Sequence, residues 1–142
     1  MEELTCLLDT PGLRIYSDEA NGWLYNQWLG MHDEVSVKTY ASYICACLQQ
    51  RPVSKILSDH TGLVGNWQGA APWIGKEYFV RLAAQGIAYF AWVYNENYHD
   101  HLAMEQTLYY TTHPAVAIFD DVASAYEWLR HCPTPQPAHQ SS

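Results

Sequence analysis

The sequence predicts an α/β fold: a mixed, mostly parallel sheet with an N-terminal hairpin and about four helices. Two runs near the start alternate apolar and polar residues and flank a turn dipeptide. Later runs are apolar at nearly every position, as strands covered on both faces are. Segments with apolar residues at helical spacing separate these strands, which favours strand-helix units.

The hairpin comes from the runs LRIYSDEA and WLYNQWLG, which flank Asn21-Gly22. That dipeptide suits the positive φ angles of a type I′ turn. The shorter run LTCLL predicts one more strand before the hairpin, with Thr10-Pro11-Gly12 as the connecting turn.

A helix follows over HDEVSVKTYASYICACLQQ, with Asp33 as its N-cap and an end before Pro52. Its apolar stripe at helical spacing consists of Val37, Tyr40, Ala41, Ile44, Cys47 and Leu48.

The next units alternate strand and helix. A short strand, VSKIL, leads to Asp59-His60-Thr61-Gly62, which we interpret as a turn that ends the strand. A helix over residues 71–85 uses Pro72 in its first turn and stops at Gly86. The run IAYFAWVY then predicts a central strand.

The last units are a helix over residues 99–110, a buried strand over residues 115–121 and a helix over residues 122–132. Asp120 or Asp121 caps the last helix. We therefore expect one domain over residues 1–132, followed by a flexible tail over residues 133–142, because PTPQPAHQSS has no apolar periodicity.

Composition excludes several classes of partner. The chain has 142 residues and a formal charge of -8, with its seven basic residues scattered, so we expect no nucleic-acid or membrane binding. The start of the chain lacks a signal-peptide pattern, which predicts a cytoplasmic protein. The four cysteines are then expected to be reduced and packed in the core.

The element order and several motifs resemble the bacterial STAS-like proteins, the superfamily of anti-sigma-factor antagonists, and most of all an uncharacterised subgroup. The motifs are YSDEANGWLYNQWLG, KILSDHTG, GNWQGAAPW, QGIAYFAWVY and FDDVASAYEWL. The resemblance covers roughly residues 12–131.

The resemblance implies a place for a phosphorylated serine, because antagonists carry one in a turn at the start of the helix after the central strand. Two alignments are open. If Asp59-His60-Thr61-Gly62 is that turn, Thr61 is the acceptor. If the helix starts nearer Asn66, the matching turn is GNWQGA, which has no hydroxyl. We favour the second alignment and expect no phosphorylation between Ser58 and Gly69.

A polar cluster is predicted at the carboxyl ends of the parallel strands, where open α/β sheets bind ligands. There the strand ends bring together Asp59 with His60, Tyr94 with Asn95, and Asp120 with Asp121. The candidate ligand-binding residues are Asp59, His60, Thr61, Asn66, Trp67, Asn95, His99 and Asp120. Turn chemistry alone also explains the residue types at 59–62, with Asn66 as a helix cap.

No metal, cofactor or catalytic residue is predicted. His99 and His101 are two apart on a predicted helix, and His101 with Glu105 is more typical of a solvated pair than of metal ligands. The sequence contains no GxSxG, Walker or GxGxxG motif, so a non-enzyme is favoured.

Aromatic residues are numerous, with six Trp and eleven Tyr against three Phe. Because buried indole and phenol groups need hydrogen-bond partners, we expect some of them on a surface. Trp23, Tyr25 and Trp28 on the hairpin are the candidate interface of a homodimer; the alternative is the helices that carry Tyr40, Tyr43, Tyr109 and Tyr110.

Two functions remain open. The first is a non-enzymatic STAS-like regulatory or protein-interaction domain, favoured by the resemblance, the acidic charge and the missing catalytic motifs. The alternative is a small-molecule-binding protein or enzyme that uses the polar cluster at the strand ends.

Overall fold

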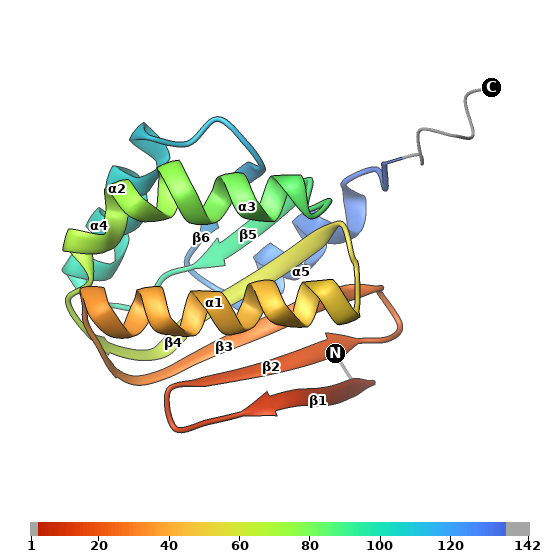
Figure 1. Ribbon diagram of the computed structural model, residues 1–142, viewed down its shortest axis with the longest axis horizontal. Helices are drawn as coiled ribbons and strands as arrows, with labels where there is room; N and C mark the ends of the chain where they lie inside the picture. The colour runs from red at the N-terminus through yellow and green to blue at the C-terminus, as the bar shows by residue number, and fades with distance from the viewer. Residues whose placement is uncertain (1–2, 136–142) are drawn as a thin grey trace.

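Six strands form one sheet in the order β1-β2-β3-β4-β5-β6, and helices cover both of its faces (Figure 1). The computed structural model describes residues 3–135. Neighbouring strands pair antiparallel from β1 to β3 and parallel from β3 to β6, which confirms the predicted mixed, mostly parallel sheet. The strands are β1 (Leu4–Asp9), β2 (Leu13–Asp18), β3 (Trp23–His32), β4 (Lys55–Gly65), β5 (Tyr89–Val93) and β6 (Ala115–Phe119).

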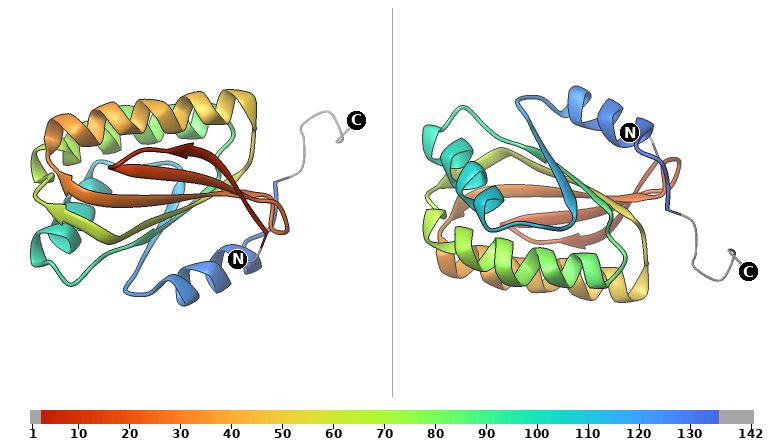
Figure 2. Two further views of the ribbon diagram at one scale, coloured as in Figure 1. Left: turned by 90° about the horizontal axis from the view of Figure 1, so that it is seen from below. Right: turned by 90° about the horizontal axis from the view of Figure 1, so that it is seen from above.

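The helices form two unequal layers, as Figure 2 shows. On one face lie α1 (Glu34–Gln50) and a continuous helical run made of η1 (Gln68–Ala70), α2 (Ala71–Trp73), η2 (Ile74–Tyr78) and α3 (Phe79–Ala84). The other face is covered by α5 (Val122–His131), while α4 (Tyr98–Tyr109) packs beside α2. Among residues 3–135, no helix is long and apolar enough to span a bilayer.

The predicted helix signals at Asp33, Asp121 and Gly86 are confirmed, but Asn66 is not a cap, because the N-cap position of η1 is Trp67 and has no side-chain cap hydrogen bond. Asp33 and Ser36 form a reciprocal capping box at the start of α1. Asp121, not Asp120, caps α5 by accepting from the Ser124 backbone N–H. Gly86, with φ of 102°, ends the α3 run as expected.

The hairpin turn differs from the predicted type I′ turn. Of its residues only Gly22 has a positive φ, and the connection covers residues 19–22. The Asp18 carbonyl accepts from the Gly22 N–H, and its carboxylate accepts from the backbone and side chain of Asn21. Asp18 therefore closes a longer turn that needs positive φ at one residue only.

The expected turn at Asp59-His60-Thr61-Gly62 is wrong, because these residues lie inside β4. The strand runs on to Gly65 because β3 extends equally far beside it, and the two stay paired to their ends. Gln27 pairs with Asp59 and Leu29 with Gly62, so β4 holds one extra residue here, a β-bulge. The bulge accommodates turn-forming residues without ending the strand.

The helix after β4 starts at Gln68, in agreement with the second alignment, in which the turn before it has no hydroxyl. Its middle, Ile74–Tyr78, is a π-helical turn. A Cβ on Gly75 would lie 2.7 Å from the Tyr110 Cβ and 2.9 Å from the Thr107 carbonyl oxygen. Only glycine therefore lets this helical run approach α4 so closely.

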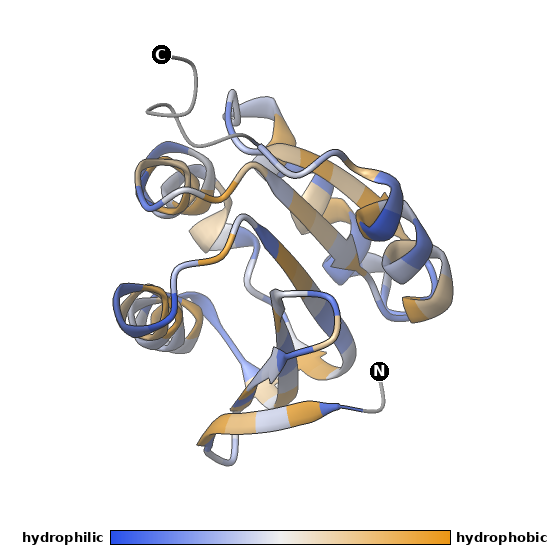
Figure 3. Cartoon of the chain, turned by 90° about the vertical axis from the view of Figure 1, so that its right-hand side faces the viewer, coloured by the Kyte–Doolittle hydropathy of each residue, from blue (hydrophilic) through white to orange (hydrophobic). Residues whose placement is uncertain are grey.

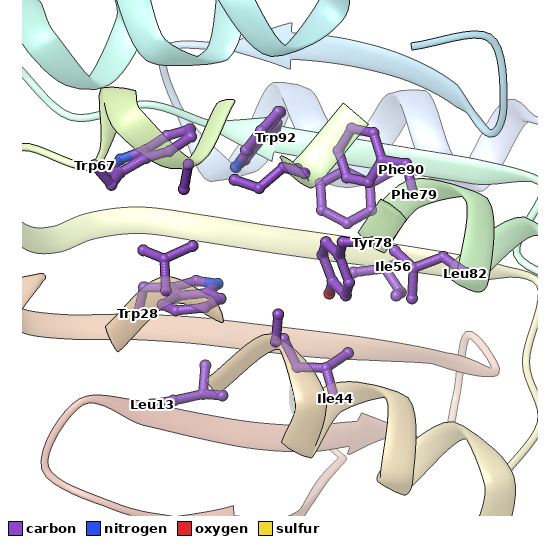
Figure 4. Close-up of a cluster of buried hydrophobic side chains, with 14 of the residues drawn as sticks. Leu13, Trp28, Ile44, Ile56, Trp67, Tyr78, Phe79, Leu82, Phe90 and Trp92 are labelled. Atoms are coloured by element: carbon purple, nitrogen blue, oxygen red, sulfur yellow. The ribbon is translucent and has the colours of Figure 1, made fainter. Parts of the chain in front are cut away.

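Two cores lie on either side of the sheet. The larger one, between the sheet and α1 to α3, is drawn in Figure 4 and contains Leu13, Trp28, Ile44, Ile56, Tyr78, Phe79 and Phe90. The smaller one lies under α5 and contains Trp23, Tyr25, Leu57, Ala91, Val93, Ala125 and Leu129. In Figure 3 the helices show hydrophilic stretches beside hydrophobic ones, as amphipathic helices do.

Two burial expectations are corrected. The β6 strand is a sheet edge with half-exposed side chains, since it has a neighbour on one side only within the described chain. All four cysteines are free, but Cys6 is exposed on the other edge strand and the remaining three are only half-buried.

Candidate functional site

Asp59 and His60 are neighbours in β4, so their side chains point to opposite faces of the sheet. Side chains alternate between the faces of a sheet, so His60 faces the α1–α3 layer and Asp59 faces the α5 side. Both side chains are buried. The predicted cluster is therefore divided between two faces at its first two residues.

His60 is the centre of a buried hydrogen-bond network. Its Nδ1 lies 2.8 Å from Asp100 Oδ1, and its Nε2 lies 3.1 Å from the indole Nε1 of Trp92. The same Asp100 oxygen accepts from Trp67 Nε1 at 2.9 Å. Asp100 Oδ2 accepts from the backbone N–H of Asn95 at 3.2 Å. Asp100 thus holds donors from three separate segments of the chain.

These partners fix the protonation state of His60. An indole N–H can only donate, so His60 Nε2 must accept, and the ring proton lies on Nδ1 and points to Asp100. Burial raises the pKa of Asp100, but His60 and the donated hydrogen bonds outweigh burial and leave this pKa below its ordinary value. Asp100 is therefore the charged acceptor at the centre of this network.

Asn95 connects the strand ends. Its side-chain Nδ2 donates to the carbonyls of His60 at 2.9 Å and Leu63 at 2.8 Å, and its Oδ1 accepts from the Asn97 N–H at 2.7 Å. β4 runs on past Asp59, the last residue that it pairs with β5, so His60 and Leu63 have no partner residue on that strand. Asn95 therefore supplies hydrogen bonds to β4 beyond the end of β5.

A small cavity lies between this network and the helix layer. Its volume is about 20 Å³, room for roughly one water-sized molecule. Trp28, Ser58, His60, Trp67, Tyr78 and Trp92 line it together with aliphatic side chains. The Tyr78 hydroxyl is buried without a hydrogen-bond partner, and burial raises the pKa of this phenol. On β3, both side-chain polar atoms of the buried Asn26 also lack a partner.

Asp59 belongs to a second polar pair on the α5 side. Its Oδ2 accepts a short hydrogen bond from the Tyr25 hydroxyl, and its Oδ1 accepts from the Thr61 N–H at 2.9 Å. Burial and the neighbouring Asp59 raise the pKa of Tyr25, so the phenol stays protonated. Both carboxylate oxygens of Asp59 are therefore used in hydrogen bonds within the protein.

The remaining predicted site residues lie at the surface. Thr61, Asn95 and Asp120 line an open depression of about 620 Å³ at the carboxyl ends of β4 and β5, together with Leu63, Val64, Tyr94, Glu96 and Asn97. Asn66 accepts from the Gln68 N–H, and His99 Nδ1 lies 3.2 Å from Gln68 Oε1. The structure thus groups His60 with Trp67 and Asn95, and Thr61 with Asn95 and Asp120, but leaves Asp59 apart from both groups.

Sequence reasoning missed Asp100, the acceptor on which the network depends. One signal was present: Asp100, Ala103, Met104 and Thr107 recur at the spacing of a buried helix stripe. A carboxylate on such a stripe needs buried donors. Trp92 and Tyr78 gave no comparable signal, since both look like ordinary core aromatics in the sequence.

The predicted exposed aromatic surface on the hairpin is wrong. Trp23, Tyr25 and Trp28 are 1%, 6% and 4% exposed. They lie on β3, which has strands on both sides and helices over both faces, so it is not an edge. Trp28 packs in the larger core, and Trp23 contacts Tyr126 of α5 edge-on.

Within residues 3–135, no three His, Cys, Asp or Glu side chains are grouped to hold a metal ion. His101 and Glu105 form an exposed pair at 3.1 Å along one face of α4, as the sequence suggested.

Comparison with known proteins places the fold. No protein-family model matches the sequence, and no curated protein does either. The structure of the anti-sigma factor antagonist SpoIIAA in its unphosphorylated form is similar, with a TM-score of 0.53, 11% identity, and coverage of 93% of this chain and 100% of that one. An uncharacterised DUF3478 protein with a SpoIIAA-like fold from Shewanella loihica PV-4 gives 0.48 at 15% identity over 89% of this chain and 92% of that one. The chain has a STAS-like fold.

Proposed function

We propose that this chain is a STAS-like regulatory or protein-interaction domain that catalyses no reaction of its own. The observation that carries the proposal is the hydrogen bonding of His60. Both ring nitrogens have partners, and the side chain is 5% exposed. A general base needs a lone pair within reach of a substrate proton, and His60 uses its lone pair on Trp92. Its role is to hold β4, β5 and α4 together.

Asp59 supports the same conclusion. A catalytic carboxylate needs an oxygen free for substrate or water, but both Asp59 oxygens accept hydrogen bonds from Tyr25 and Thr61. The acidic candidates of the predicted cluster thus divide into buried structural groups and the exposed Asp120.

The surface best suited to a protein partner lies at the ends of β3 and β4. Met31 and Val64 pair across these strands and are 75% and 50% exposed. We name Met31 and Val64 the carboxyl-edge patch. Exposed apolar side chains gathered beside a depression are typical of an interaction site, and Val64 also lines the depression.

A matched pair of variants tests the proposal. Val64 and Val80 are exposed to 50% and 52%, but Val80 lies on α3, away from the patch. A partner captured from the source organism is expressed and purified, and its Kd is measured by calorimetry. We expect Val64→Asp to weaken binding at least about tenfold, because a charge is buried in the interface, and Val80→Asp to leave it unchanged. Equal effects of the two changes, or no partner that binds directly, would contradict the proposal.

The alternative function, a small-molecule-binding protein or enzyme, rests on the depression lined by Thr61, Asn95 and Asp120. Its neighbouring acid Glu96 and its amides suit a polar or cationic ligand. Screening small cationic metabolites by thermal shift separates the two functions. A ligand that raises the Tm of the wild type but not of Asp120→Ala would favour the alternative.

The charge of the chain limits the class of partner. A formal charge of -8 opposes binding to nucleic acid and to anionic membranes, so the partner we propose is a protein met in the cytoplasm.

Thr61 is exposed on β4 but lies seven positions before the helix start at Gln68, and we keep the prediction that it is not phosphorylated.

A further inference from the structure

We infer that two copies of the chain pair through β6, antiparallel about a two-fold axis, and so join their sheets into one. The inference goes beyond the proposed function, because β6 lies at the opposite edge of the sheet from β1 and contributes none of the carboxyl-edge patch (Figures 1 and 2). Within the described residues, β6 pairs with β5 alone.

The sequence of β6 leaves this edge unprotected. Its residues, AVAIF, carry no charge and no proline, its pairing with β5 has no bulge, and its side chains are half-buried or exposed. Natural edge strands are usually blunted by a charge, a proline or a bulge. The other edge, β1, follows that rule: its register shifts between Cys6 and Leu8, and Asp9 forms an ion pair with Arg14. Of the two edges, only β6 offers an uncharged strand without a bulge, between Pro114 and Asp120.

The backbone of β6 has free donors and acceptors in a defined pattern. The Ala115 N–H donates to the Ala88 carbonyl, and the Phe119 carbonyl accepts from the Tyr94 N–H. In a strand, both polar groups of a residue point to one side, and the side alternates. Ala115, Ala117 and Phe119 therefore bond to β5, while the N–H and C=O groups of Val116 and Ile118 point outward.

One register uses all of these outward groups. If Ala117 lies on the two-fold axis, Val116 of one copy faces Ile118 of the other, and the two exchange both backbone hydrogen bonds; the symmetric pair does the same. The small Ala115 then faces the large Phe119. A second copy is thus complementary in hydrogen bonding and in volume.

Charge also fits this register. The paired strands bring no like charges together, although each chain has a formal charge of -8. The long-range repulsion between two acidic chains is screened by salt, so dimerisation strengthens as ionic strength rises.

Helix α5 leaves the backbone edge of β6 accessible for this pairing. The buried residues of α5, Ala125 and Leu129, share a core with Leu57 of β4 and Ala91 of β5, which lie two strands and one strand inside the edge. At the edge itself, Trp128 of α5 lies against Phe119 on one face of β6. Because the two-fold axis is perpendicular to the sheet, both copies of α5 then lie on the same face without being in the path of β6 pairing.

Sedimentation equilibrium of the full chain tests the dimer, with Val116→Pro and Val116→Ala as a matched pair. Both substitutions reduce the contact area of the side chain at position 116, but only proline removes the outward backbone N–H. We expect the wild type to dimerise with a Kd that falls as salt is added. Val116→Pro should raise this Kd at least about thirtyfold, because two backbone hydrogen bonds are lost in each dimer. Val116→Ala should change the Kd little. A wild type that stays monomeric well above micromolar concentration overturns the inference, and so does equal behaviour of the two variants.

Cross-linking tests the register in a protein that keeps its fold. Residues at position 117 would be a non-hydrogen-bonded pair with Cα atoms about 4.5 Å apart, within disulfide range. We expect Ala117→Cys to form a disulfide between copies on mild oxidation, identified by peptide mapping. Val116→Cys forms none, because its two copies lie farther apart than the roughly 7 Å that a disulfide spans. Absence of the 117 cross-link overturns the register, whereas the partner assay with Val64→Asp is unaffected by either result.

Discussion

At the scale of single residues, Asp100 carries the largest share of the interior hydrogen bonding. It accepts from His60, Trp67 and the Asn95 backbone, and these donors belong to β4, to the start of the helical run and to the segment after β5. Removing one side chain would leave three buried donors unpaired, which costs far more than the hydrogen bonds contribute in net terms. Its position therefore affects the packing of the whole α1–α3 face.

We predict that Asp100→Ala lowers the free energy of unfolding by at least about 3 kcal/mol, because three buried donors lose their acceptor. Asp100→Asn keeps one oxygen for His60 and Trp67 but turns an NH₂ group toward the Asn95 N–H, so its loss is smaller, about 1–3 kcal/mol. Urea unfolding measures both. The exposed Asp120→Asn is the control and should change stability by less than about 0.5 kcal/mol. If Asp100→Asn had the same free energy of unfolding as the wild type, ionisation of this carboxyl would contribute nothing to stability.

Two buried tyrosines give opposite predictions for the same substitution. Tyr78→Phe removes a hydroxyl that has no partner, so the free energy of unfolding should stay within about 1 kcal/mol of wild type or rise. Tyr25→Phe removes the donor to Asp59 and leaves a buried carboxylate short of a partner, which should cost about 1.5–3 kcal/mol. Thermal or urea unfolding compares them. If Tyr78→Phe proved the more destabilising change, the cavity would hold a hydrogen-bonding partner for that hydroxyl.

At the scale of elements, α5 is held to the sheet by one buried lysine. Lys55, the first residue of β4, donates from Nζ to the carbonyls of Leu129 at 2.7 Å and Cys132 at 2.8 Å. These carbonyls lie at the C-terminal end of α5, where a cation also meets the negative end of the helix dipole, and the Leu129 carbonyl additionally accepts from the Cys132 N–H. The contact ties the start of β4 to the end of α5, across more than half the chain.

We predict that Lys55→Met loosens the end of α5. The apolar stem is kept, but the last carbonyls lose their donor, and the global loss should be about 1–3 kcal/mol. Amide hydrogen exchange should rise most in the last turn of α5. Lys76→Met is the control, at an exposed position on η2 where Nζ lies 4.9 Å from the centre of the Tyr110 ring. It should lower stability by at most about 1 kcal/mol and leave exchange in α5 unchanged. Uniform exchange in both variants would mean that core packing alone fixes α5.

At the scale of the whole molecule, two buried groups link stability to pH. His32 lies between the Gly12 carbonyl, 2.9 Å from its Nε2, and the Ser36 hydroxyl, 2.9 Å from its Nδ1. Burial lowers the pKa of His32 below its ordinary value of 6.5, with the hydrogen bond to Gly12 opposing. The unfolded chain therefore binds a proton that the folded chain does not, and stability falls as pH drops below that value.

We predict that the free energy of unfolding declines from about pH 6.5 downward, by at most about 1.4 kcal/mol per pH unit for this one proton. Below the ordinary value of 3.8 a second decline begins, because Asp100 has a lowered pKa in the fold and its contribution is lost as the carboxyl is protonated. Urea unfolding across this range measures both steps. His32→Gln, which keeps a donor for Gly12, should flatten the first step, and an unchanged slope would assign that step to another group.

The order and type of the elements follow from local signals in the sequence. Apolar periodicity and capping residues are local, so the helix cap at Asp33, the stop at Gly86 and the strand over residues 89–93 could all be predicted from neighbours along the chain. The buried faces of the helices could be predicted in the same way, from apolar residues at helical spacing. The STAS-like fold was recognisable because these local signals occur in that order.

Which residues contact one another depends on the packing of segments that are distant in sequence. The turn-forming residues at 59–62 stay in β4 because β3 pairs with them and a bulge absorbs the extra residue, and pairing between distant strands leaves no local pattern. Trp23, Tyr25 and Trp28 are buried because β3 became an interior strand, whereas the apolar β6 became an edge. Asp100 joins His60 because α4 packs against the helical run that follows β4. Each of these outcomes depends on contacts between residues far apart in sequence, while propensity and periodicity describe only near neighbours.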